Sequence, residues 1–137
     1  MQVVIQPSEV SDELRALWQH AYKRLISHRG GPELYNTIRR DVDDDELLAH
    51  VVAHGALWTI GDDRALLGFA LVRNEVVEGV FVDHQRRREH VATELLNALV
   101  AGENPPKDGY ALPGDRGMKS LYESFGWKAR LLTMRGE

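Results

Sequence analysis

Hydrophobic positions in this chain switch between short strand-like runs and helical spacing. A β-branched run over residues 2–6, ended by Pro7, predicts a first strand. Ser11 is a suitable N-cap for the segment that follows, where apolar residues recur at the spacing of a helix. These residues are Leu14, Leu17, Trp18, Ala21, Tyr22, Leu25 and Ile26. The chain therefore opens with a strand and a long amphipathic helix.

The next segment contains breaks and helix caps. Residues 29–32, Arg-Gly-Gly-Pro, end the first helix, and residues 33–40 have room for another helical turn or two. Asp43 followed by Glu46 three residues later predicts a capping box. A helix with apolar positions on one face then runs to Gly55.

Acidic residues crowd the start of that helix, at Asp41 and residues 43–46. Acids near a helix N-terminus interact favourably with the helix dipole, so we prefer this interpretation to a metal site. His50 and His54 lie four residues apart, which also suits a shared metal. Because no metal-binding motif accompanies them, we interpret them as surface histidines and expect no metal.

The remaining pattern predicts one mixed sheet. Residues 56–60 and 65–73 flank a turn at Asp62 and Asp63 and predict a hairpin. Further strands are predicted at residues 76–83, 109–112 and 128–134, and helices at 90–100 and 117–125. The order is strand, helix, helix, three strands, helix, strand, helix, strand. It predicts an α/β fold, a mixed β-sheet with helices on both faces.

Composition narrows the classes of function. A chain of 137 residues, 43% hydrophobic and 28% charged, suits a single globular domain over residues 1–137. The absence of cysteine excludes disulfides, thiolate catalysis and cysteine-based metal sites. A net charge of −4 gives no general reason to expect nucleic-acid binding. There is no apolar run of membrane-spanning length and no signal-peptide pattern at the N-terminus, so we expect a cytoplasmic protein.

The stretch VDHQRRREHVATELL, residues 82–96, holds the first candidate chemistry. It combines a strand end, a basic turn and the start of a helix. A helix N-terminus suits an anion, because its N–H groups are unpaired and its dipole is positive there. Glycines usually allow phosphates to approach such a turn, but here three arginines and a histidine occupy it. Taken alone, a basic turn between a strand and a helix is an equally good interpretation.

A second stretch, ALPGDRGMKSLYESFGW at residues 111–127, favours the phosphate-binding interpretation of the turn over a plain basic turn. It resembles the C-terminal signature N-x-x-A-x-x-L-Y-x-x-x-G-F of the GNAT superfamily of acyl-CoA-dependent N-acetyltransferases, with Asp115 at the asparagine position. Residues 87–92 resemble the superfamily's pyrophosphate loop, R/Q-x-x-G-x-G/A, through Arg87 and Ala92. His90 stands where the first glycine is usual, and His84 stands at the usual proline of the preceding strand end.

The resemblance implies a GNAT-like fold, acetyl-CoA as co-substrate and direct attack by a primary amine of the acceptor. It implies that the backbone N–H of Val82 contacts the thioester carbonyl. The other implied coenzyme-binding residues are Arg86, Arg87, Arg88, His90, Val91, Ala92 and Asp115. For Asp115 we prefer the simpler role of a cap for the helix that follows.

Tyr122 takes the position of the family's general acid. A phenol with an ordinary pKa of about 10 can protonate a departing thiolate. The alternative is a core tyrosine, because Met118, Leu121 and Phe125 share its helical spacing.

Glu78 interrupts an apolar strand, where strand alternation places it on one face with Val80 and Val82. A carboxylate among valines costs desolvation energy unless it has a partner or a task. The run Glu-Gly-Val-Phe-Val resembles strands of some family members, in which an acid acts as base or binds substrate. The alternative is a glutamate at a strand edge that faces water. Gly79 would permit a β-bulge beside it.

Three classes of function follow, and an N-acetyltransferase leads them. The first alternative is a degenerate domain of the same fold that binds CoA weakly or regulates a partner. The second, a small nucleic-acid binder, lacks a recognised motif. The expected partner is a small-molecule or peptide amine, with no nucleic acid and no membrane, and dimers are common among relatives. Asp41 to Glu46 hint at a cationic acceptor such as a polyamine, aminoglycoside or lysine side chain, although capping explains these acids equally well.

Overall fold

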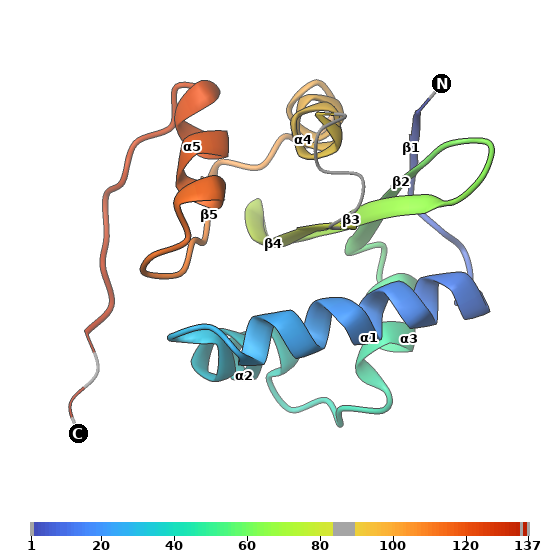
Figure 1. Cartoon of the computed structure of the whole chain (residues 1–137), viewed down its shortest axis with the longest axis horizontal. Helices are drawn as coiled ribbons and strands as arrows, with labels where there is room; N and C mark the ends of the chain where they lie inside the picture. Colours follow the sequence, from blue (N-terminus) through green and yellow to red (C-terminus); the bar gives the residue numbers. More distant parts are fainter. Residues whose placement is uncertain (1, 84–89, 135, 137) are drawn as a thin grey trace.

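The computed structural model describes residues 2–83, 90–134 and 136. The elements follow the order β1 (Val3–Ile5), α1 (Asp12–Ile26), α2 (Gly31–Arg39), α3 (Leu47–Ala53), β2 (Leu57–Gly61), β3 (Leu66–Arg73), β4 (Val76–Val82), α4 (Val91–Val100), β5 (Asp108–Gly109) and α5 (Arg116–Ser124). One five-stranded sheet has the order β1-β2-β3-β4-β5, as Figure 1 shows. The first four strands are antiparallel neighbours, and β5 is parallel to β4.

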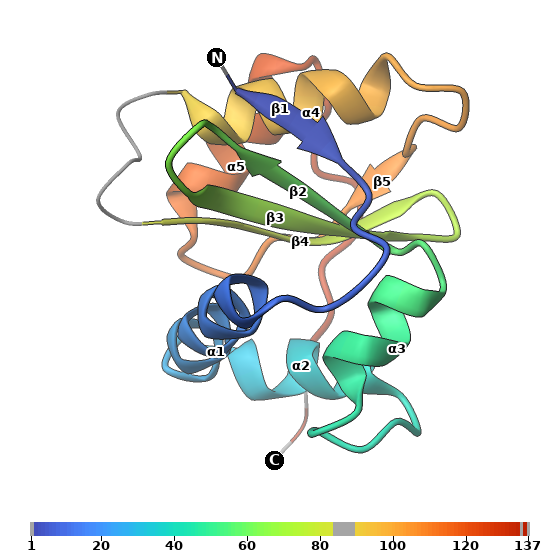
Figure 2. The same ribbon diagram turned by 90° about the vertical axis from the view of Figure 1, so that its right-hand side faces the viewer.

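Helices cover both faces of this sheet. Figure 2 shows α4 and α5 on one face and α1, α2 and α3 on the other. Two separate cores result. The first joins α1, α2 and α3 to Leu57, Phe69 and Leu71 of the sheet, and the second joins α4 and α5 to Ile60, Leu67, Ala70 and Val77. The predicted α/β class, with a mixed sheet between two helical layers, is confirmed.

The first helix forms as its pattern predicts. Ser11 occupies the N-cap, and its side chain accepts a hydrogen bond from Leu14 N at 3.1 Å. Leu14, Leu17 and Trp18 are buried against the sheet. The apolar face of α1 is therefore satisfied by tertiary packing, which supplies most of the stability of a helix in a folded protein.

Residues 27–46 differ from the prediction. A complete helix, α2, begins at Gly31, so three helices rather than two separate β1 from β2. The capping box is wrong, because α3 begins at Leu47 with Glu46 at its N-cap and no side-chain cap. Asp44 instead accepts a hydrogen bond from the Tyr35 hydroxyl at 2.9 Å and pairs with Arg39 at 3.4 Å.

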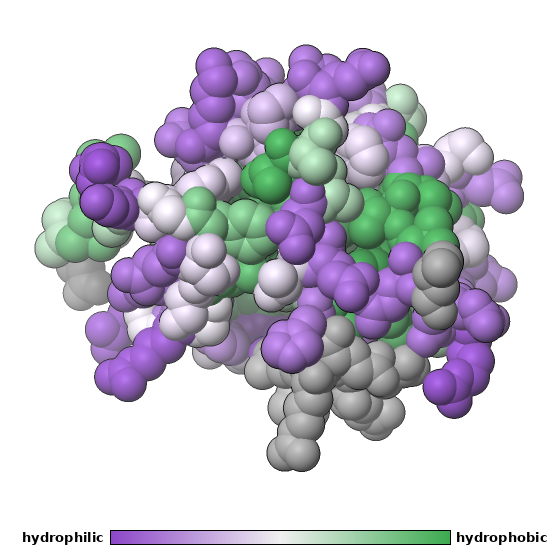
Figure 3. Space-filling model, turned by 90° about the horizontal axis from the view of Figure 1, so that it is seen from above, coloured by the Kyte–Doolittle hydropathy of each residue, from purple (hydrophilic) through white to green (hydrophobic). Residues whose placement is uncertain are grey.

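The last strand is also wrong. Residues 128–134 form no strand, and β5 is shorter than the predicted residues 109–112. Leu131, Leu132 and Met134 are 91%, 70% and 80% exposed. The segment lies outside the helical layers in Figure 1 and is not part of the five-stranded sheet. Viewed from above, hydrophobic residues gather on this segment at the far left and over the edge strand β1 at the right (Figure 3).

No helix in the described part of the chain has the length and hydrophobicity needed to cross a bilayer.

Candidate functional site

The parallel pair β4–β5 separates soon after it begins. Only Val76 and Val77 of β4 pair with β5, and Tyr110 N then donates to Val77 O at 2.9 Å. Strand β4 continues to Val82, while the chain beyond Tyr110 turns away toward α5. The second half of β4 therefore lines an opening.

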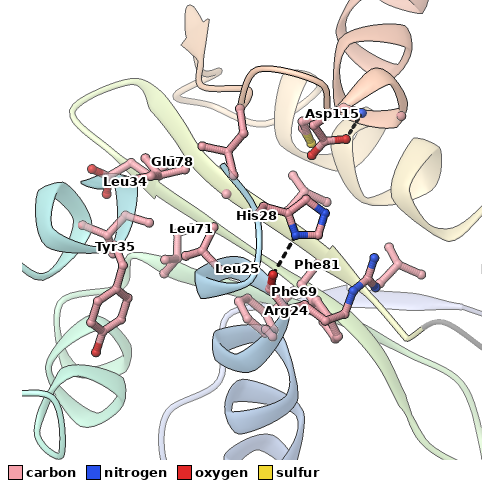
Figure 4. Close-up of a pocket in the computed structure, with 18 of the residues that line it drawn as sticks. Arg24, Leu25, His28, Leu34, Tyr35, Phe69, Leu71, Glu78, Phe81 and Asp115 are labelled. Atoms are coloured by element: carbon pink, nitrogen blue, oxygen red, sulfur yellow. Dashed lines mark hydrogen bonds between the residues drawn. The ribbon is translucent and has the colours of Figure 1, made fainter. Parts of the chain in front are cut away.

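A cleft of about 510 Å³ occupies this opening. It lies between the α1–α2 side of the molecule, β4 and the start of α5 (Figure 4). The residues that line it on the sheet, α4 and α5 sides include Gly79, Val80, Phe81, Val82, Ala92, Asp115 and Met118. The volume suits an extended small molecule.

Backbone groups of β4 point into the cleft. Asp83 N donates to Leu67 O of the β3 side at 2.7 Å, which fixes the alternation of the antiparallel ladder. By that alternation, Val80 and Val82 direct their N–H and C=O groups away from β3. Because β5 pairs only with the start of β4 within the described residues, these groups face the cleft that both valines line.

The turn between α1 and α2 reaches across the cleft. Gly30 has a left-handed backbone with φ of 78°, and a Cβ at this position would lie 3.5 Å from Leu112 and 3.6 Å from Pro113. The turn therefore touches the segment that leads into α5. This contact joins the two walls, and a residue with a side chain at position 30 would strain the left-handed backbone.

His90 has the backbone conformation of a glycine. Its φ is 57° and its ψ 32°, so the residue that replaces the family glycine occupies the left-handed region. It is exposed and stands at the N-cap of α4, where its side chain makes no cap hydrogen bond. The loop predicted at Arg86, Arg87 and Arg88 lies outside the described residues.

The start of α4 adjoins the cleft. Val91 is fully buried and anchors the first turn of the helix to the sheet, while Ala92 lines the cleft. The first N–H groups of a helix have no intrahelical acceptor, so this end of the cleft suits an anion.

Glu78 sits in a β-bulge of β4. The ladder pairs Leu71 with Gly79 and Val72 with Val77, so Glu78 is the extra residue. The bulge suggested by Gly79 is present, but the predicted face is wrong. An extra residue breaks strand alternation, so the Glu78 carboxylate meets the end of α2 instead of sharing a face with Val80.

The Glu78 carboxylate is paired with two arginines. The side chain is only 2% exposed, which contradicts a glutamate that faces water. Arg73 Nε donates to Oε1, and Arg40 Nη2 lies 3.7 Å from Oε2. Arg73 Nη2 also donates to Ile38 O. Arg40 has φ of 55° and ψ of −121° at the end of α2, a strained conformation beside the site.

Tyr122 lies in the core next to the cleft. It is 7% exposed, and its ring stacks on Trp127 with centroids 5.2 Å apart. Its hydroxyl donates to Tyr110 O at 3.0 Å, where the chain leaves the sheet. Burial, followed by the charge of Asp115, raises the pKa of this hydroxyl above its usual value. Tyr122 is not among the residues that line the cleft.

Asp115 caps α5 as predicted. Its Oδ1 accepts a hydrogen bond from Met118 N at 3.0 Å. The same side chain lines the cleft (Figure 4), so capping and ligand contact do not exclude each other.

Three basic residues that line the cleft were missed by the sequence analysis: Arg24, His28 and Arg116. Arg24 and His28 of the α1 end line the cleft, and the Arg24 guanidinium lies 5.5 Å from the centre of the Phe81 ring. His28 Nδ1 is 2.8 Å from Arg24 O. Basic residues at a helix C-terminus are expected from the helix dipole alone, so no local signal distinguished Arg24 and His28.

The histidines of α3 contact each other rather than the cleft. The His50 and His54 rings lie 4.1 Å apart, and His54 Nδ1 is 2.8 Å from His50 O. Within the described residues, no group of three His, Asp or Glu side chains is placed to hold a metal ion.

No protein-family model matches the chain, and no curated protein matches its sequence. Solved structures do match its fold. The chain aligns with AAC(6')-Iy in complex with the bisubstrate analogue CoA-S-monomethyl-acetylneamine at a TM-score of 0.56 and 17% identity, covering 100% of this chain and 99% of that one. A GNAT-family acetyltransferase from Bacillus cereus gives 0.59 at 14% identity, covering 92% and 82%. The aminoglycoside antibiotic 6'-N-acetyltransferase AAC(6')-Ih from Acinetobacter baumannii gives 0.53 at 15%, covering 100% and 99%. The fold of the chain is therefore that of the GNAT-family acetyltransferases.

Proposed function

We propose that the protein transfers an acetyl group from acetyl-CoA to a primary amine. The left-handed backbone of His90 carries this proposal, because this residue has the conformation that glycine commonly supplies where a backbone approaches a ligand closely. The separation of β4 from β5 supports it by opening a cleft beside that turn. A solved structure of the same fold holds an analogue that contains CoA.

The cleft has the donors that acetyl-CoA requires. The start of α4 offers N–H groups to phosphate oxygens, and the N–H groups of Val80 and Val82 suit the amides and the thioester carbonyl of an extended ligand. We assign the coenzyme contacts to Val82, His90, Val91, Ala92 and Asp115, together with Arg86, Arg87 and Arg88. Acetyl-CoA, when bound, supplies the acetyl group as a thioester. The amine nitrogen bonds to its carbonyl carbon, the C–S bond breaks, and the sulfur takes a proton.

The coenzyme contact at His90 has a direct test. His90→Val is expected to weaken acetyl-CoA binding about tenfold, because β-branched residues resist the left-handed conformation. His90→Gly adopts it freely and is expected to bind as well as the wild type or better. Isothermal titration measures both dissociation constants. Equal losses in the two variants would assign the effect to the imidazole, and no binding to the wild type at millimolar acetyl-CoA would overturn the proposed function.

Tyr122 is the proposed proton donor to the leaving sulfur. Its raised pKa keeps the phenol protonated through neutral pH. Because its hydroxyl also holds Tyr110 O, Tyr122→Phe must separate catalysis from positioning. Loss of a general acid should lower kcat about 100-fold with an unchanged acetyl-CoA dissociation constant. A variant with normal kcat and weaker coenzyme binding would assign Tyr122 to positioning alone.

Glu78 is the proposed base or acceptor ligand. Both of its oxygens face guanidinium groups, so an intervening water is the alternative proton acceptor. Glu78→Gln preserves the shape of the side chain and removes its capacity as a base. If Glu78 is the base, the variant should lose the acidic limb of the pH profile of kcat/KM. If the pH profile of kcat/KM keeps its shape in Glu78→Gln and only the rates fall, a water molecule rather than Glu78 accepts the proton.

A further inference from the structure

The cleft changes character along its length. At one end lie Arg24, whose guanidinium is 5.5 Å from the centre of the Phe81 ring, and His28, whose Nδ1 is 2.8 Å from Arg24 O. At the other end Figure 4 shows Leu34, Tyr35 and Leu71 around the start of β4, beside Glu78. The cationic end suits coenzyme phosphates. The apolar end is therefore left for the body of the acceptor.

The apolar end has little to offer a second positive charge. Among the described residues that line the cleft, the carboxylates are Glu78 and Asp115. Glu78 is already paired with Arg73 and Arg40. Asp115 caps α5 and lies toward the other end of the cleft in Figure 4.

The acidic stretch of residues 41–46 does not supply that charge either. None of its residues lines the cleft. Asp44 is held by Tyr35 and Arg39. The Tyr35 hydroxyl is turned away from the cleft toward Asp44, so the ring presents its apolar part to the cleft (Figure 4). The acids of residues 41–46 therefore give no support to a polycationic acceptor in this cleft.

We infer that the acceptor is a monoamine on an apolar body, aromatic or aliphatic, and not a polyamine or an aminoglycoside. This rests on the proposed function. The reacting amine would lie over Gly79 and Val80, between the two ends of the cleft. Its hydrocarbon part would contact Leu34, Tyr35 and Leu71, where a second ammonium group would lose its hydration without gaining a partner. Leu34 is partly buried and borders this end, so it is the specificity-determining residue of the site.

The test compares amines that differ in one group. Hexylamine and 1,6-diaminohexane share a chain and differ by one amine, while phenethylamine and kanamycin represent the aromatic and polycationic classes. With saturating acetyl-CoA and detection of free thiol, kcat/KM for hexylamine is expected to exceed that for 1,6-diaminohexane by about tenfold or more. Equal or greater kcat/KM for the diamine or for kanamycin would overturn the inference and leave the proposed function intact.

A designed variant sharpens the test. Leu34→Glu places a carboxylate at the apolar end and should raise the ratio of diamine to monoamine kcat/KM by about tenfold. Leu132→Glu adds the same charge at a residue that is 70% exposed and outside the cleft, so its ratio should stay at the wild-type value. An unchanged ratio in a folded Leu34→Glu protein would overturn the assignment of the acceptor to this end.

Amine binding without acetyl-CoA separates the inference from the proposed function. Isothermal titration of hexylamine and 1,6-diaminohexane into the full chain should show tighter binding of the monoamine. A preference for the diamine would overturn the inference whether or not thiol is released. Tighter monoamine binding without acetyl-CoA binding or thiol release would support the cleft assignment and overturn the proposed function.

Discussion

Tyr122 and Glu78 are both buried polar residues, but they lie on opposite sides of the sheet and are satisfied in different ways. Tyr122 belongs to the α4–α5 layer, is uncharged and donates one hydrogen bond to Tyr110 O. Glu78 faces the α2 end and is paired with Arg73 and Arg40. A neutral hydroxyl needs one acceptor, whereas a buried carboxylate needs compensating charge.

The difference extends to the two layers. Val91, Leu95 and Leu96 of α4 are fully buried, so that layer packs closely on the sheet. The α1–α2 side leaves room for the cleft, and the ion pairs of Glu78 stand at its end. Loss of an arginine from the charged network of Glu78 should therefore cost more stability than loss of the Tyr122 hydroxyl.

The largest effect is expected from Arg73→Met. The Arg73 side chain is 12% exposed and bonds both Glu78 and Ile38 O, so its removal leaves the buried carboxylate with the longer contact to the half-exposed Arg40. The free energy of unfolding should fall by about 3 to 5 kcal/mol, measured by urea denaturation. The double variant with Glu78→Leu should recover most of this loss, since it removes the unpaired charge as well.

Arg40→Met is the matched control. The Arg40 side chain is 50% exposed and its contact with Glu78 is longer, so a loss of at most about 1 kcal/mol is expected. Methionine keeps a Cβ at φ of 55°, so the backbone strain is the same in the variant. Losses of equal size at Arg40 and Arg73 would contradict the ranking of the two ion pairs.

Tyr122→Phe should have a smaller effect. It keeps the ring on Trp127 and removes one hydrogen bond to a carbonyl, which is worth about 1 kcal/mol. Tyr110→Phe, at a residue that is 41% exposed, is a control that should change stability little. A loss at Tyr122 as large as that of Arg73→Met would show that the hydroxyl organises more of the fold than one hydrogen bond.

Most of the fold was predictable because its helices and strands bury apolar residues that recur with the period of each element. Leu14, Leu17 and Trp18 on α1 and Leu95 and Leu96 on α4 face the sheet as their spacing predicts. The segment of residues 128–134 has the same local signal but forms no strand beside β5, the outermost strand at that side of the sheet, and sequence periodicity does not report pairing.

Part of the site was predictable from the resemblance, since Val82, Ala92 and Asp115 line the cleft. His90 drew attention because it replaces a glycine, and its left-handed backbone meets the demand of that position. The orientation of Glu78 was missed, because a one-residue bulge reverses the face of a strand without changing its composition. Arg24 and His28 reach the cleft through packing between segments distant in sequence. The catalytic roles of Tyr122 and Glu78 stay predictions.

Alkaline pH should sharpen the contrast between Tyr122 and Glu78. The pKa of Tyr122 is raised by burial, so its neutral form contributes stability that is complete below the unfolded value of about 10 and is lost as the pH rises above it. Urea denaturation at pH 8 and pH 10.5 should show a larger loss in the wild type than in Tyr122→Phe. The pKa of Tyr35 is also raised, by burial and its bond to Asp44, so Tyr35→Phe measures that separate contribution. Equal losses in wild type and Tyr122→Phe would contradict the prediction.

The smallest effect is expected from Asp115→Asn. Asparagine caps a helix as well as aspartate, so α5 keeps its cap on Met118 N and stability at pH 8 should stay within about 0.5 kcal/mol of the wild type. The charge of Asp115 is the second cause of the raised pKa of Tyr122, after burial. Its removal should lower that pKa toward the ordinary value, so the variant should lose less stability than the wild type between pH 8 and pH 10.5. Asp108→Asn, an exposed change on β5, is the control for a general charge effect. If both variants flatten the pH dependence equally, net charge rather than the Asp115–Tyr122 interaction is the cause.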